Sequence, residues 1–123
     1  MTRIYLAAPY SHPEYKTRAR RCLYATQAAN RLMQRGLLVY SPLTHGHAIA
    51  ALGGLGSEFD SWREHCLSIL RLWAQELYVL KLPGWKDSIG VAAEMAEADK
   101  HGLPIVCISM VEAGLNLIAA QGE

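Results

Sequence analysis

Residues 84–94 read GWKDSIGVAAE and lie between two runs of different character. The run before them, residues 77–82 (LYVLKL), has the composition of a buried strand, and the pattern after them stays helical to about His101. Ser88 is a favoured residue type at a helix N-cap, because its hydroxyl can accept a free backbone N–H of the first turn. The stretch therefore predicts a strand, a tight turn and the start of a helix.

Glu94 lies one turn inside this predicted helix, at the edge of an apolar stripe that contains Val91, Met95 and Ala98. Partial burial raises the pKa of such a carboxyl, and the nearby helix N-terminus lowers it. Gly90 allows close approach to the backbone, and the free N–H groups favour an anion. Glu94 is therefore a candidate nucleophile or acid–base group. The alternative is a surface Glu that only stabilises the helix dipole.

Composition places the chain among ordinary globular domains. Its 123 residues fit one domain, residues 1–123, with 51% hydrophobic and 19% charged residues. The formal net charge of +1 gives no electrostatic reason to expect a nucleic-acid polymer or an anionic membrane as a partner. No apolar run approaches the roughly 20 residues that span a bilayer.

The three cysteines, Cys22, Cys66 and Cys107, are widely spaced and flanked by apolar residues. They are interpreted as reduced core cysteines, because an odd, scattered set does not form a disulfide framework. The chain runs directly from Met1 into a predicted strand, so no signal peptide is expected. A cytoplasmic location is the resulting expectation.

Basic residues are concentrated near the beginning of the chain. Seven of the twelve lie in the first 35 residues, where the only acidic residue is Glu14. One interpretation is a solvated face of the first helix, and the other is local attraction of a phosphate. The seven are Arg3, Lys16, Arg18, Arg20, Arg21, Arg31 and Arg35.

Predicted strands alternate with helices long enough to cross over a sheet, which favours an α/β fold with a parallel sheet and helices on both faces. The strands are expected over residues 3–8, 37–40, 77–82 and 104–108. The helices are expected from Ser11 or His12 to about 34, and over 59–75, 88–101 and 112–121, with a short turn or helix through Ala51. The apolar positions chosen for the first helix are Tyr15, Ala19, Leu23, Ala28 and Leu32. The glycine-rich residues 53–57 are interpreted as a flexible connection or a lid.

In a parallel sheet, ligands bind beyond the carboxyl ends of the strands. Three loops rich in small and polar residues are expected to meet there, covering residues 7–11, 41–47 and 84–88. The predicted substrate-binding residues are Ala7, Pro9, Tyr10, Ser11, Ser41, Pro42, His45, Gly84, Trp85, Ser88 and Gly90.

Other motifs are absent or ambiguous. No Rossmann glycine motif follows the first strand, and neither a Walker-type phosphate loop nor a Gly-x-Ser-x-Gly elbow is present. His45 and His47 have a spacing that could serve one metal, although no third ligand is evident, so we expect no metal and no cofactor. The preferred role for a histidine here is a hydrogen bond to substrate, through His45, or a cap of the loop.

Two aromatic residues have alternative interpretations. Tyr5 is either a packed core ring or, if the first and third strands are neighbours, a hydroxyl that orients Glu94 and tunes its charge. Trp85 is either a hydrophobic plug or a stacking wall for a flat ring.

These residues resemble a known family. The segments Ile4-Tyr5-Leu6-Ala7-Ala8-Pro9 and Ser41-Pro42-Leu43-Thr44-His45, followed by Gly84-Trp85 and Ser88-x-Gly90-x-x-x-Glu94, resemble the nucleoside 2-deoxyribosyltransferase superfamily. Within that superfamily the chain is most similar to the uncharacterised DUF1937 branch. The resemblance covers about the whole chain in the order of its elements.

The resemblance implies a flavodoxin-like sheet of about four to five strands and a homo-oligomer, a dimer or tetramer. It also implies cleavage of the N-glycosidic bond of small-molecule (deoxy)nucleosides or nucleotides. Glu94 matches the family nucleophile, Tyr5 the tyrosine that holds it, and Ser88 the residue that binds the sugar or a 5′-phosphate.

One departure concerns the acid that protonates the leaving base. The family commonly has an Asp on the helix before the third strand, and the corresponding position here lies near Ser68. Asp60, further upstream, is the candidate substitute. The expected function is therefore N-glycosidic cleavage or transfer through Glu94. The alternatives are a non-catalytic nucleotide or nucleotide-sugar binding module and a metal-dependent hydrolase that uses His45 and His47.

Overall fold

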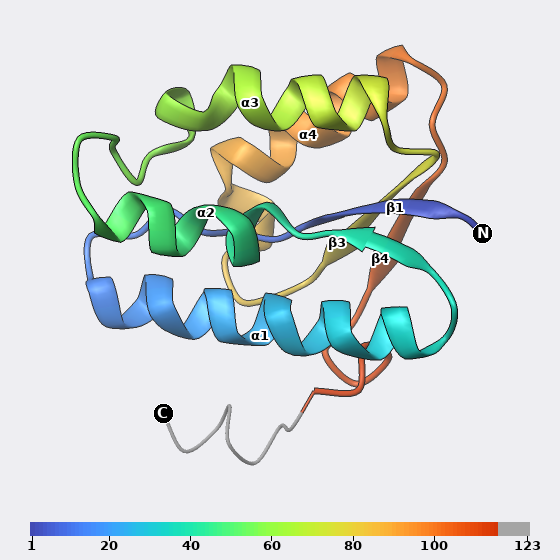
Figure 1. Ribbon diagram of the computed structural model, residues 1–123, viewed down its shortest axis with the longest axis horizontal. Coiled ribbons are helices and arrows are strands. Elements are labelled where there is room, and N and C mark those ends of the chain that lie inside the picture. Colours follow the sequence, from blue (N-terminus) through green and yellow to red (C-terminus); the bar gives the residue numbers. More distant parts are fainter. Residues whose placement is uncertain (116–123) are drawn as a thin grey trace.

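The computed structural model describes residues 1–115 and shows a three-layer α/β fold (Figure 1). Four parallel strands form one sheet in the order β2-β1-β3-β4. This confirms the predicted parallel sheet with helices on both faces. The strands are β1 (Arg3–Ala7), β2 (Leu38–Tyr40), β3 (Glu76–Leu80) and β4 (Ile105–Ile108). The helices are α1 (Tyr15–Gln34), α2 (Pro42–Ala51), α3 (Phe59–Leu72) and α4 (Ile89–Lys100), with a 3-10 turn, η1 (Trp85–Asp87).

The two faces of the sheet have separate cores. Leu6 and Ala8 face α1, where the core includes Tyr24, Ala28 and other small residues of that helix. Tyr5 and Ala7 face the opposite side, which α3 and α4 cover (Figure 1). Because β1 is central and covered on both faces, residues Ile4 to Ala7 are completely buried, as is usual in parallel sheets.

The first helix differs from its prediction in both its start and its buried face. It begins at Tyr15 after Glu14, which makes no side-chain cap. The carbonyl of His12 is occupied by Arg18, and Pro13 disfavours a helical conformation at the preceding residue. The buried residues of α1 are Tyr24, Ala25, Ala28, Ala29 and Leu32, whereas the predicted apolar positions Tyr15 and Leu23 are 58% and 48% exposed.

Three other predictions need correction. The third helix ends at Leu72, before the predicted Gln75, because the backbone N–H of Gln75 already donates to Arg3 O in the sheet at 2.8 Å. Cys107 is exposed on the edge strand β4, so only Cys66 of the three cysteines is a buried core residue. Residues 110–114 form a hydrogen-bonded turn, and the rest of the helix predicted over 112–121 lies outside the described residues.

Among residues 1–115, no helix is both long enough and apolar enough to cross a membrane.

Candidate active site

A cavity of about 800 Å³ opens beyond the carboxyl ends of β1 and β3. These strands are hydrogen-bonded neighbours, with Tyr5 opposite Leu77 and Ala7 opposite Val79. The chain leaves β1 toward α1 on one face and leaves β3 toward α4 on the other, so the cavity occupies the topological switch point of the sheet. This is the location predicted from the order of the elements.

Glu94 lies at what we call the inner end of the cavity, together with Tyr5 and Cys66. Glu94 is buried on α4, only 3% exposed, and its carboxylate accepts a hydrogen bond from the Tyr5 hydroxyl. Burial raises the pKa of Glu94 to about 8, although the hydrogen bond from Tyr5 opposes this shift. The expected Tyr5–Glu94 contact is therefore present, and Glu94 is more deeply buried than its place at the stripe edge suggested.

The surroundings of Glu94 contain polar groups but, among the described residues, no cation that stabilises its charge. Cys66, on α3, lines the cavity, and burial raises the pKa of its thiol to about 11, so the thiol is protonated at neutral pH. Burial also raises the pKa of Tyr40 to about 12, and its buried hydroxyl has no hydrogen-bond partner among residues 1–115. Tyr5 itself has its pKa raised, first by burial and then by the charge of Glu94. A negative charge on Glu94 is consequently unfavourable.

The turn before α4 forms as expected at Ser88. Its hydroxyl accepts a hydrogen bond from Val91 N at 3.1 Å, so Ser88 is the N-cap, and it also lines the cavity. Gly90 lines the cavity, as predicted, and its missing side chain has a further effect. A Cβ at Gly90 would lie 2.9 Å from Cδ1 of Phe59, so the missing side chain makes room for the ring that packs α3 against α4.

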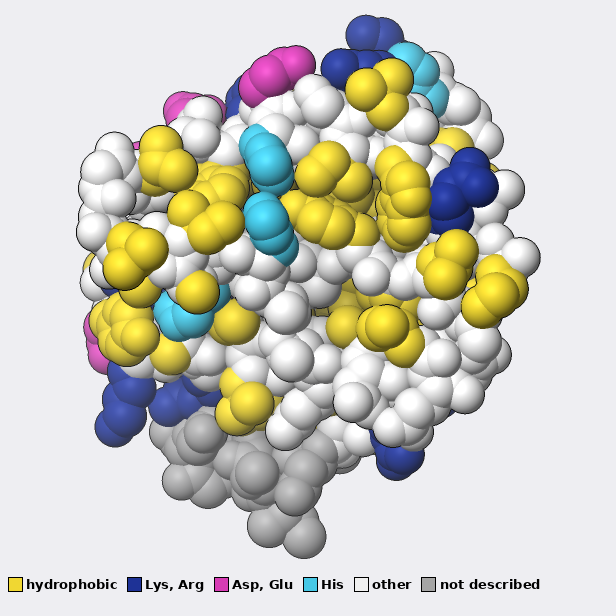
Figure 2. Space-filling model, in the orientation of Figure 1, with side chains coloured by type: hydrophobic (Ala, Val, Ile, Leu, Met, Phe, Trp, Pro, Cys, Tyr) yellow, Lys and Arg dark blue, Asp and Glu magenta, His cyan; other side chains and the backbone are white. Residues whose placement is uncertain are grey.

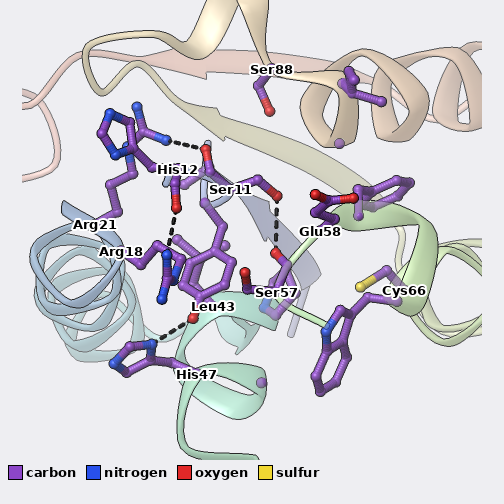
Figure 3. A pocket seen from close by; sticks show the side chains of 18 of the residues that line it. Ser11, His12, Arg18, Arg21, Leu43, His47, Ser57, Glu58, Cys66 and Ser88 are labelled. Carbon is purple, nitrogen blue, oxygen red and sulfur yellow. Dashed lines mark hydrogen bonds between the residues drawn. The ribbon is translucent and has the colours of Figure 1, made fainter. Parts of the chain in front are cut away.

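The opposite side of the cavity, which we call the outer end, carries Arg18 and Arg21 (Figure 3). Arg21 donates to Ser11 O at 3.0 Å and to Pro83 O at 3.3 Å, and Arg18 donates to the carbonyls of His12 and Pro13. Within residues 1–115, neither guanidinium forms an ion pair with a carboxylate. Partial burial lowers the pKa of Arg21, yet a guanidinium stays charged at neutral pH.

Gly84 allows Arg21 to reach this position. Its backbone has φ +91°, a left-handed conformation that favours glycine, and a Cβ there would lie 2.9 Å from Nη2 of Arg21. Gly84 therefore lines the cavity, as expected, and its missing side chain leaves room for the guanidinium of Arg21.

Several other predicted substrate-binding residues line the cavity. Tyr10, Ser11 and Pro42 all border it, together with His47, which was predicted only as an alternative metal ligand. The hydroxyl of Tyr10 lies 2.6 Å from Nδ1 of His47, and Ser11 Oγ donates to Ser57 O at 3.0 Å. The second of these bonds holds the glycine-rich segment beside the cavity (Figure 3).

Five predicted substrate-binding residues do not line this cavity: Ala7, Pro9, Ser41, His45 and Trp85. Ala7 and Pro9 are buried in the core. Ser41 caps α2 by accepting a hydrogen bond from Thr44 N at 3.2 Å.

His45 and Trp85 face other neighbours because the segments that carry them turn away from the cavity. His45 stacks on His65 with ring centroids 5.4 Å apart. Figure 2 shows that histidines lie among hydrophobic side chains on the face in view. Trp85 borders a separate depression with Lys81 and Lys86.

Asp60 borders the cavity in the first turn of α3, with its side chain 85% exposed and paired to Arg63 at 3.3 Å. Glu58, which the sequence interpretation did not consider, borders the cavity just before it. Arg18, Arg21 and Cys66 were also absent from the predicted site. The concentration of basic residues in the first 35 was the available signal for the arginines, through the phosphate alternative.

The metal alternative receives no geometric support from the described residues. Among residues 1–115, no group of three or more His, Cys, Asp or Glu side chains is placed to hold a metal ion. The rings of His45 and His47 contact different partners, His65 and Tyr10 respectively.

Comparison of the sequence with curated proteins finds no match. A protein-family model, described as a domain of unknown function (DUF1937), matches residues 2–110. The match covers β1 through β4 and every cavity-lining residue named above, so the chain belongs to the DUF1937 family.

Proposed function

We propose that this protein cleaves or transfers the N-glycosidic bond of (deoxy)nucleosides or nucleoside monophosphates, with Glu94 as the nucleophile. The observation that carries the proposal is the Tyr5–Glu94 hydrogen bond at the inner end of the cavity. A carboxylate held by a phenol can attack a sugar anomeric carbon and form a glycosyl-enzyme. The resemblance of the Ser88-to-Glu94 motif to the nucleoside 2-deoxyribosyltransferase superfamily supports the same chemistry.

The outer end favours nucleoside monophosphates over nucleosides. Arg18 and Arg21 offer charge to the cavity without a carboxylate partner among the described residues, and guanidinium groups bind phosphate through charge-assisted hydrogen bonds. Ser88 and the first N–H groups of α4 border the same cavity and favour an anion. A nucleoside monophosphate could therefore place its phosphate at the outer end and its sugar beside Glu94.

Ionisation of Glu94 is then part of the mechanism. With a pKa of about 8, the carboxyl is mostly protonated at neutral pH, and only the ionised form attacks carbon. Positive charge develops on the sugar in the oxocarbenium-like transition state, which favours the carboxylate at the moment when it is needed. Burial destabilises the free carboxylate, and this cost is offset only when positive charge develops on the sugar next to it.

The test is an assay of the wild-type protein, Glu94→Gln and Glu94→Ala against deoxynucleosides and their monophosphates. We expect cleavage by the wild type and a loss of at least about a thousandfold in both variants, since the nucleophile is removed. Glu97→Gln is the matched control, because Glu97 is on the same helix and pairs with Arg71 and His101 outside the cavity. The proposal fails if the wild type cleaves none of these compounds or if Glu94→Gln keeps full activity.

A non-catalytic nucleotide-binding module is the second candidate, and a specific observation favours it. Glu94 is mostly protonated at neutral pH, whereas the arginines of the outer end remain charged. Such a cavity can bind a nucleotide without reacting with it. Thermal stabilisation by nucleoside monophosphates, without turnover at any pH up to 9, would support this candidate over the enzyme.

A further inference from the structure

The glycine-rich segment, residues 53–57, joins α2 to α3 and is held by two side chains at its last two residues. Gly56 O accepts a hydrogen bond from Trp62 Nε1 at 2.8 Å, and Ser57 O accepts one from Ser11 Oγ at 3.0 Å. The first four residues of the segment are exposed, and a Cβ on either of the first two would meet no atom within 4 Å. The position of the segment beside the cavity therefore depends on these two hydrogen bonds.

Ser11 connects this segment to the outer end of the cavity. Its backbone oxygen accepts a hydrogen bond from Arg21 Nη1 at 3.0 Å, while its hydroxyl donates to Ser57 O, and Figure 3 shows both bonds. Arg21 also donates from Nη2 to Pro83 O at 3.3 Å. A guanidinium has five N–H donors, so Arg21 keeps others for an anion in the cavity. Ser11 thus joins a phosphate-binding cation to the glycine-rich segment.

The segment leads directly into the wall of the cavity that α3 forms. Phe59 and Trp62, in the first turn of α3, line the cavity, as does Cys66 one turn further along. Phe59 packs on Gly90 of α4, where a Cβ would lie 2.9 Å from the ring. A shift of Ser57 would therefore move side chains that line the cavity toward its inner end.

We infer that Ser11 is a positioning residue, which couples a phosphate group bound at Arg21 to the glycine-rich segment and, through it, to the α3 wall. The inference deepens the proposed function and rests on it, since the phosphate is taken to be that of a nucleoside monophosphate. A phosphate bound to Arg21 restricts the guanidinium, and this restriction holds Ser11 and its bond to Ser57 in place. Binding energy from the phosphate then orders the wall around the sugar, which raises kcat as well as affinity.

Ser11→Ala tests the inference, because it removes one of the two hydrogen bonds and keeps the other. The backbone oxygen that accepts from Arg21 remains, whereas the hydroxyl bonded to Ser57 is lost. The measurement is amide hydrogen exchange of residues 53–62, without inorganic phosphate and at concentrations that saturate each protein by calorimetry. We expect phosphate to slow exchange about threefold or more in the wild type and in Ser11→Thr, which keeps a hydroxyl, and to have no such effect in Ser11→Ala. Ser68→Ala is the matched control, since this serine is on α3 outside the cavity, and should behave as the wild type.

The kinetic test compares a deoxynucleoside monophosphate with its nucleoside. Ser11→Ala should lower kcat about 3- to 10-fold on the monophosphate, the range for one hydrogen bond, and leave kcat on the nucleoside unchanged. A purely structural role would lower both.

The outcomes separate this inference from the proposed function. The inference is overturned by equal protection in Ser11→Ala and the wild type, by a phosphate-bound wild type without protection, or by failure of phosphate to bind. The proposed function still stands in these cases if the wild type cleaves monophosphates and Glu94→Gln does not. Protection that depends on Ser11, without cleavage of any substrate by the wild type, supports the coupling and overturns the proposed function.

Discussion

The inner end of the cavity disfavours a charged side chain, whereas the outer end holds two charged ones. At the inner end, Glu94 is buried, has a pKa raised to about 8, and its one stabilising partner among the described residues is the neutral hydroxyl of Tyr5. At the outer end, Arg18 and Arg21 are held by backbone carbonyls and keep their charge available. A ligand whose anionic group is separate from its reactive centre would therefore satisfy both ends.

The largest expected effect concerns stability at the inner end. The folded pKa of Glu94, about 8, lies above its ordinary value of 4.5, so the folded protein binds more protons than the unfolded chain between these pH values. The contribution of Glu94 to the free energy of unfolding is fully present below pH 4.5 and is lost as the pH rises through 8. Glu94→Gln removes the penalty and should be about 2 to 4 kcal/mol more stable than the wild type at pH 9, with little difference at pH 4.5.

Urea unfolding of both proteins at pH 4.5 and pH 9 measures this difference, with Glu64→Gln as an exposed control. Equal stabilities of Glu94→Gln and the wild type at pH 9 would show that Glu94 ionises without a penalty. The inner end would then accept a charged side chain as readily as the outer end does.

The next effect concerns the outer end. Arg21→Ala removes a guanidinium without a carboxylate partner among the described residues, and charge-assisted hydrogen bonds to phosphate contribute about 1.5 to 3 kcal/mol. We expect KM for a deoxynucleoside monophosphate to rise about 10- to 100-fold while KM for the nucleoside changes little. Lys16→Ala is the control, since Lys16 is an exposed cation on α1 outside the cavity. A proportional loss on both substrates would mean that Arg21 only holds the loop of Ser11.

The smallest effect distinguishes the two tyrosines near Glu94. Tyr5→Phe removes the donor that lowers the pKa of Glu94, so the rise of kcat/KM with pH should move from about 8 to a higher value. If this midpoint moves up by about one pH unit, activity at pH 7 falls about tenfold, and much of it returns at high pH. Tyr40→Phe is the matched control, because its hydroxyl donates to no described residue. An unchanged pH midpoint in Tyr5→Phe would show that the phenol has no effect on the carboxylate.

Much of the inner end could be predicted from the sequence because a local pattern specifies its main residue. The run from Ser88 to Glu94 specifies a capped helix with a carboxylate one turn in, whereas the pairing of β1 with β3 was only a condition of the Tyr5 prediction and is shown by the structure. Tyr5 then has to face α4, since strand residues alternate between faces. The depth of burial of Glu94 and the presence of Cys66 were missed, because both depend on how α3 packs over α4, where Phe59 contacts Gly90.

The outer end could not be predicted in the same way. The sequence shows that seven basic residues lie in the first 35, but it does not show which of them border the cavity. The structure places Arg18 and Arg21 there through the conformation of a short loop. That loop is shaped by Pro13 and by hydrogen bonds from Arg18 and Arg21 themselves. Trp85 does not line the cavity for a related reason, since it follows the sharp turn at Gly84 and borders the depression of Lys81 instead.

The nucleophilic role of Glu94 can be tested by mass spectrometry of the wild-type protein, quenched during turnover of a deoxynucleoside monophosphate and then mapped by peptide. We expect a deoxyribosyl phosphate adduct on the peptide that contains Glu94, and no adduct in Glu94→Gln. Turnover without any covalent adduct in rapidly quenched samples, or an adduct on another residue, would contradict Glu94 as the nucleophile.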